Sequence, residues 1–191
     1  MSRTARIVIP DVSVHIVHRG HDRSECFFEE ADYLAYLNAL RAYAPRLLCS
    51  VHAYCLMTNH VHVLVTPHAA AACAQLMKHL AQRHSRRING KRGRSGTLWE
   101  GRFFSALVPT ESYALNCYRY IERNPVKPAM VEHPGEYRWS SYRANAGGPR
   151  ASLCATPLEA DVLNDIRKAT RGGYVMGAKR RLRGRPKKKK W

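Results

Sequence analysis

With 191 residues and 45% hydrophobic composition, the chain can form one full domain with a buried core and an additional segment. Its net charge of +18, from 32 Lys and Arg against 14 Asp and Glu, favours a polyanionic partner such as nucleic acid. The sequence lacks an apolar run of about 18 residues and an apolar N-terminal segment, so neither a membrane span nor a secretory signal is expected. We therefore expect a cytoplasmic protein without a membrane partner.

The hydrophobic pattern predicts strands and helices in alternation as far as residue 109. Apolar and polar residues alternate in the strands over 7–19 and 60–67, the strand over 47–57 is apolar on both faces, and apolar stripes mark the two helices. The expected elements are a strand over 7–19, a helix over 29–43, strands over 47–57 and 60–67, a helix over 69–89 and a strand over 99–109. This β-α-β-β-α-β order predicts an α+β protein of the ferredoxin-like type with one antiparallel sheet. We expect the helices on one face, the strand of His60 in the centre, and the other face or an edge open to a substrate.

The six cysteines are spread along the chain without a C-x-x-C pair. This spacing favours neither a structural zinc site nor a disulfide framework. We expect reduced thiols, most of them buried.

Two histidines in the strand over 60–67 are candidate metal ligands. His60 and His62 alternate with valines, and residues two apart in a strand project from the same face, about 6.6 Å apart. Two imidazoles at this separation can bind one divalent metal ion, because imidazole is largely unprotonated near neutral pH. An H-x-H can also arise by chance among ten histidines, as two strand residues with ordinary partners. The nearby His15, His18 and His21 have no clear ligand spacing.

A further helix is predicted between Thr110, a good N-cap, and Pro125, which ends helices. Tyr120 and Asn124 lie four residues apart and share one face of this helix. A phenol that could attack phosphorus is thus one turn from an amide oxygen that could complete the metal site. Tyrosines more often serve in packing, and Tyr118 is expected on a different face.

Together these motifs resemble the HUH single-tyrosine transposases of the IS200-like family, in particular the REP-associated tyrosine transposases. The resemblance covers most of residues 1–145 in the expected order. It rests on His60-Val61-His62 and on the stretches over 96–103, 119–127 and 137–144. Several separate motifs with consistent spacing are more specific than a single H-x-H.

The resemblance implies a catalytic domain over 1–145 that carries its tyrosine on the additional helix. Tyr120 would attack a phosphate of single-stranded or hairpin DNA, releasing a 3′-hydroxyl and keeping the 5′-phosphate in a covalent bond. Mg²⁺ or Mn²⁺, held by His60, His62 and Asn124, would assist the reaction. The resemblance also implies a bacterial protein associated with the nucleoid, and it is compatible with a homodimer.

Basic residues predicted to contact nucleic acid lie in four places. They are Arg86 and Arg87 in the helix over 69–89, Lys91, Arg92 and Arg94 in a flexible loop over 90–96, Arg102, and Arg183, Arg185 and Lys187 in the tail. We expect 146–177 to be a linker with a short helical segment and 178–191 to be a basic tail that is disordered when free. Its Arg183-Gly184-Arg185-Pro186 core resembles an AT-hook, but a nonspecific polycation is an equal alternative.

Two other classes of protein agree with part of the sequence. A non-catalytic DNA-binding protein, domesticated or degenerate, would explain the charge but not the combination of His60, His62, Tyr120 and Asn124. A metal-dependent nuclease that uses water would explain the histidines but would leave Tyr120 without a role.

Overall fold

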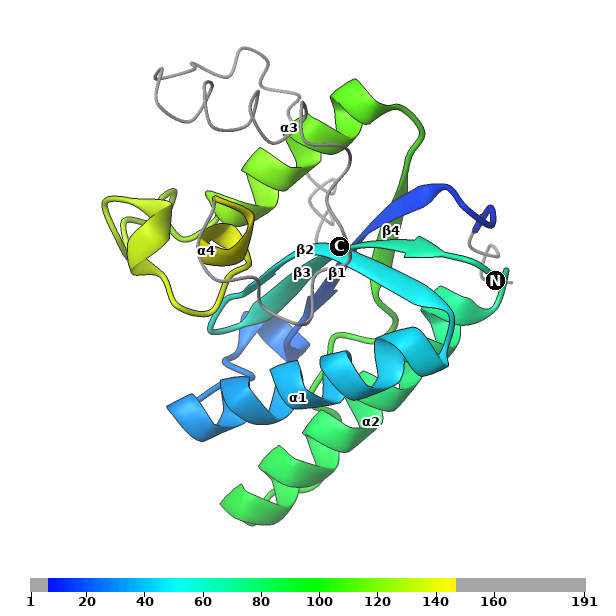
Figure 1. Cartoon of the computed structure of the whole chain (residues 1–191). Helices are drawn as coiled ribbons and strands as arrows, with labels where there is room; N and C mark the ends of the chain where they lie inside the picture. Colours follow the sequence, from blue (N-terminus) through cyan, green and yellow to red (C-terminus); the bar gives the residue numbers. More distant parts are fainter. Residues whose placement is uncertain (1–6, 147–191) are drawn as a thin grey trace, which may run out of the picture.

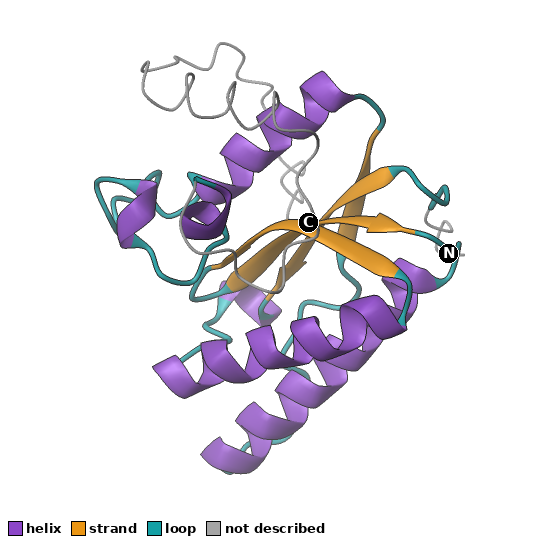
Figure 2. Ribbon diagram, in the orientation of Figure 1, coloured by secondary structure: helices purple, strands orange, loops and turns teal. Residues whose placement is uncertain are grey.

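The computed structural model describes residues 7–146 and shows one antiparallel sheet between two layers of helices (Figures 1 and 2). The sheet has the strand order β2-β3-β1-β4. Its elements are β1 (Ser13–Arg19), α1 (Glu30–Arg46), β2 (Cys49–Leu56), β3 (His60–Pro67), α2 (Ala72–Arg92), β4 (Phe104–Val108) and α3 (Glu111–Glu122). Three shorter helical turns complete the described part of the chain. η1 (His21–Arg23) lies between β1 and α1, and η2 (Pro134–Glu136) and α4 (Tyr142–Asn145) come after α3.

The observed topology confirms the predicted fold class. The β-α-β-β-α-β order, the single antiparallel sheet and the additional helix α3 are all present, and β3 is a central strand as expected. Several boundaries differ from the prediction, and the first strand begins at Ser13 rather than at residue 7. β4 begins only at Phe104, preceded by bends at 100–102 and an isolated β-bridge between Trp99 and Gly20, and α2 continues to Arg92. Lys91 and Arg92 therefore belong to the last turn of a helix, which ends at Gly93 with φ of 59°, and not to a loop.

Helices cover both faces of the sheet, so the expectation of helices on one face only is wrong. Val61, Val63 and Val65 of β3 pack into one core with α1 and α2. Leu64 points to the opposite face, where a second core contains Ile121 of α3. The reason is that α3 has an apolar side, which is buried by packing against the face of the sheet opposite to α1 and α2 (Figure 1).

A segment after α3 fixes the end of that helix to the edge strand β2. The backbone N–H of Leu56 donates to the carbonyl of Trp139 at 2.9 Å, and that of Ser141 donates to the carbonyl of Tyr54 at 3.0 Å. Two side chains then contact the buried Glu122 of α3. Ser141 Oγ and Asn145 Nδ2 donate to its Oε1 at 2.8 and 2.7 Å. The orientation of α3 is thus set by polar contacts as well as by packing.

The described residues also bear on three other expectations. Five cysteines are free and buried, as predicted, whereas Cys154 lies outside the described residues. Within residues 7–146 no helix combines the length and the apolar character that crossing a membrane requires. The predicted linker over 146–177 and tail over 178–191 lie, except for residue 146, outside the part of the chain that the structure describes.

Candidate active site

His60 and His62 both project from β3 toward the face that α3 covers. Their ring centroids are 4.9 Å apart, and His62 is buried whereas His60 is half-buried. His60 Nδ1 donates a hydrogen bond to Oδ1 of Asn59 at 2.5 Å. Nε2 of the same ring is then unprotonated, and its lone pair is available to a metal ion. The geometry agrees with the predicted sharing of one face by the two rings.

Both imidazoles are neutral at physiological pH. Burial lowers the pKa of His60 to about 4, with a further contribution from the charge of Arg19. Burial lowers the pKa of His62 to about 2, and the neighbouring His60 and His15 add to this effect. Because a metal ion binds the neutral form of imidazole, both rings can serve as ligands without losing a proton.

Helix α3 places Tyr120 beside these histidines. The helix begins as predicted, with Thr110 Oγ1 accepting a hydrogen bond from the backbone N–H of Tyr113 at 3.3 Å. The rings of Tyr120 and His62 meet edge to face with centroids 5.7 Å apart, and Tyr120 is half-buried. Tyr118 is buried in the core under α3, against which Tyr120 also packs. The ring centroid of Tyr118 lies 6.4 Å from that of His52 of β2, whereas Tyr120 meets His62 of β3.

Asn124 lies two residues beyond Glu122, the last residue of α3, so it follows the helix rather than belonging to it as predicted. It is buried, and its Nδ2 donates to the backbone carbonyl of Tyr120 at 2.8 Å. This bond satisfies one of the carbonyl groups that a helix leaves unpaired at its C-terminus. The hydrogen bond uses the amide nitrogen of Asn124, so its amide oxygen is the atom that would coordinate a metal ion.

His15 of β1 is a member of the cluster that the sequence did not reveal. Its Nε2 lies 3.0 Å from Nδ1 of His62, and its ring centroid lies 5.8 Å from that of Tyr120. Burial lowers the pKa of His15 to about 4, so one neutral ring donates to the other. The contact depends on the pairing of β1 with β3, 47 residues apart in sequence, which no local spacing indicates.

Lys127 adds a positive charge at the same place. Its Nζ lies 3.8 Å from the centroid of the Tyr120 ring. Burial, followed by the charge of Arg123, lowers the pKa of this lysine. Lys127 falls within the motif over 119–127, but its position over the ring follows from the turn after α3 and could not be read from the motif.

The structure does not bring the predicted nucleic-acid contacts of α2 to this cluster, because α2 packs on the other face of the sheet. Arg87 Nε lies 3.2 Å from Asp32 Oδ1, Lys91 forms an ion pair with Glu29, and the Arg92 guanidinium lies 3.9 Å above the Phe28 ring. The three cations thus hold α2 against α1 and the segment before it. Of the other predicted contacts, Arg86, Arg94 and Arg102 are exposed, whereas Arg183, Arg185 and Lys187 lie outside the described residues.

Within residues 7–146 no three His, Cys, Asp or Glu side chains form a group that could hold a metal ion. The predicted metal site is of another composition, with two imidazoles and one amide. It therefore depends on Asn124 as the third protein ligand.

Comparison with known proteins identifies the class to which this fold and site belong. Residues 8–124 match the family of IS200-like transposases, and the chain is a member of that family of DNA transposases.

Among solved structures, a REP-associated tyrosine transposase bound to a REP hairpin is similar, with a TM-score of 0.65 and 17% identity over 83% of this chain and 94% of that chain. A putative transposase from Deinococcus radiodurans matches with a TM-score of 0.42 and 21% identity, over 64% of this chain and 97% of that chain. Comparison with curated protein sequences gives no match.

Proposed function

We propose that the protein cleaves and rejoins hairpin-containing single-stranded DNA through a covalent bond between Tyr120 and a 5′-phosphate. The observation that carries this proposal is the edge-to-face contact of Tyr120 with His62, in which α3 brings a phenol to a pair of neutral imidazoles. The choice of substrate is supported by the similar fold of a tyrosine transposase whose structure contains a REP hairpin.

In this proposal His60, His62 and Asn124 would hold a divalent ion, Mg²⁺ or Mn²⁺. The two imidazoles suit Mn²⁺, whereas phosphoryl chemistry commonly uses Mg²⁺. A bound ion would polarise the phosphate oxygens and offset the charge of the transition state. The bond between His15 and His62 would hold the His62 ring in one orientation for this role.

Tyr120 then acts as the nucleophile. A bond forms between its phenolic oxygen and phosphorus, the bond between phosphorus and the 3′-oxygen breaks, and the phenolic proton passes to solvent while the departing 3′-oxygen gains one. Attack by another 3′-hydroxyl reverses these changes and joins two strands. The ammonium group of Lys127, next to the Tyr120 ring, would attract the phosphate and stabilise the negative charge there.

The alternatives differ in what they require of Tyr120. A nuclease that activates water needs the histidines but not a tyrosine in contact with them. A non-catalytic DNA-binding protein needs neither, and the charge of the chain alone would suffice. The position of Tyr120 between His62, His15 and Lys127 favours the covalent mechanism over both.

The decisive experiment incubates the full chain with labelled hairpin DNA and Mg²⁺ or Mn²⁺, and then looks for an adduct that survives SDS. The Tyr120→Phe variant is expected to bind DNA but form no adduct, because it lacks only the phenolic oxygen. The Tyr118→Phe variant is the matched control on the same helix and should form the adduct. Cleavage by Tyr120→Phe at the wild-type rate would reject the mechanism.

A further inference from the structure

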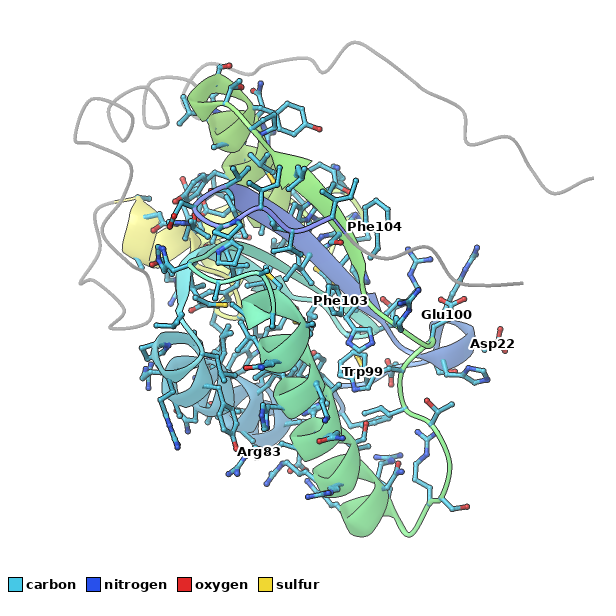
Figure 3. All side chains as sticks on the ribbon, turned by 90° about the vertical axis from the view of Figure 1, so that its right-hand side faces the viewer. Asp22, Arg83, Trp99, Glu100, Phe103 and Phe104 are labelled. Atoms are coloured by element: carbon cyan, nitrogen blue, oxygen red, sulfur yellow. The ribbon has the colours of Figure 1, made fainter. Side chains whose placement is uncertain are left out.

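Two neighbouring phenylalanines at the start of β4 have opposite environments. Phe103 is buried and lies 6.5 Å from the His18 ring between centroids, on the side of α1 and α2. Phe104 is 64% exposed on a strand at the edge of the sheet. Figure 3 shows Phe104 at the outside of β4 and Phe103 beside Trp99. Single exposed apolar side chains are common on protein surfaces, so the position of Phe104 relative to the proposed active site decides whether the ring can serve in binding.

The strand register connects Phe104 with the proposed active site. Phe104 pairs with Val17 of β1, Val17 pairs with His62 of β3, and His62 pairs with Cys55 of β2. Directly opposed residues of antiparallel strands share a face, so Phe104 and His62 project from the same face. They are separated by one strand, or about 10 Å at a strand spacing of about 4.8 Å.

Positive charge accompanies this row of residues. Arg19 follows Val17 by two positions on the same face, is exposed, and pairs with His60 in the register. A ligand that extends from His62 toward Phe104 would thus meet a cation and an exposed aromatic ring. Single-stranded DNA has the matching chemistry, with a phosphate for the arginine and a base for the ring.

We propose that Phe104 is a stacking platform for a nucleobase of the single-stranded DNA next to the phosphate that Tyr120 attacks. The inference rests on the proposed function and adds to it a site for one unpaired base. Stacking on an aromatic ring tolerates every base, so this site would hold the strand in place rather than read its sequence. On this proposal the exposed part of the face around Phe104 binds DNA and not a second copy of the chain.

The test measures binding of the full chain to a labelled single-stranded oligonucleotide by fluorescence anisotropy, in EDTA so that no cleavage occurs. The Phe104→Ala variant is expected to bind about 5- to 100-fold more weakly, whereas Phe104→Trp should bind at least as well as the wild type. The slope of log K against log salt should not change in Phe104→Ala, because no phosphate contact is lost. Arg19→Ala should reduce that slope by up to about 0.7.

Matched controls separate stacking from other effects. Tyr113→Ala removes another exposed aromatic ring, on α3, and should leave the affinity unchanged. Phe104→Leu keeps an apolar side chain without a π face and should resemble Phe104→Ala. An oligonucleotide with one abasic position, moved along the strand, should weaken wild-type binding at one position and have no such effect on Phe104→Ala.

Wild-type affinity in Phe104→Ala would overturn the proposal. So would a wild-type dimer in sedimentation that Phe104→Ala abolishes, because the ring would then serve an interface between two chains. Because binding is measured in EDTA, absence of a covalent adduct in the earlier experiment would reject the mechanism without deciding the role of Phe104.

Discussion

Replacing the buried Glu122 by Gln should stabilise the protein at alkaline pH. Burial raises the pKa of this carboxyl from an ordinary 4.5 to about 7, although hydrogen bonds from Ser141 and Asn145 oppose the shift. The difference of roughly 2.5 between the two pKa values corresponds to about 3 kcal/mol. Glutamine keeps an oxygen that can accept both hydrogen bonds and carries no charge at any pH.

The pH window follows from the direction of the shift. Below about pH 4.5 the carboxyl is protonated in the folded and unfolded chains, so its ionisation does not affect stability. Between 4.5 and about 7 only the unfolded chain releases the proton, and the free energy of unfolding falls as pH rises. Above 7 both states are ionised and the loss stays constant. The free energy of unfolding of Glu122→Gln should thus exceed that of the wild type by under about 1 kcal/mol at pH 5 and by about 3 kcal/mol at pH 8.

Urea denaturation of both proteins at the two pH values measures this difference. The buried histidines, whose pKa values are lowered, destabilise both proteins as pH falls below about 6.5, and this effect cancels in the comparison. The exposed Glu132 provides the control, because Glu132→Gln should change stability by less than about 0.5 kcal/mol at either pH. A difference between Glu122→Gln and the wild type that is equal at pH 5 and pH 8 would refute the reasoning.

Four further predictions concern function. His62→Ala should abolish metal binding in calorimetry, whereas His52→Ala, another strand histidine with a pKa lowered to about 4, should keep it. Wild-type metal affinity should stay nearly constant from about pH 5.5 to 8, and a steep loss near 6.5 would show that the imidazoles are not held neutral by burial. Lys127→Ala should slow adduct formation on the order of tenfold, measured in single turnover, and an unchanged rate would leave the cation without a catalytic role. Deleting residues 178–191 should weaken duplex binding and reduce the slope of log K against log salt by up to about 0.9 per lost phosphate contact. Cleavage of a short hairpin at saturating concentration should survive the deletion. Equal slopes for the full and the shortened chain would contradict a DNA-binding tail.

Much of the fold could be predicted because its signals are local. Alternating valines around His60 and His62 indicate a strand, and Thr110 and Pro125 bound α3 through capping and steric effects that involve only neighbouring residues. The order of elements then leaves few topologies, since short connections place consecutive elements side by side. Local signals are weaker at element ends, and the end of α2 at Gly93 and the late start of β4 were not foreseen.

The sequence by itself determined the family, the two imidazoles on one strand face, and Tyr120 on a helix that starts after Thr110. It also predicted Asn124 on that helix, whereas α3 ends at Glu122. Only the tertiary structure decided that α3 packs on the second face of the sheet, which is what brings Tyr120 to His62. It also decided that His15 bonds to His62 and that Phe104 lies in the same row of paired residues as His62. The physical reason is that spacing along a chain fixes the direction of a side chain within its own element, whereas contacts between elements depend on strand register and on which buried surfaces pack together.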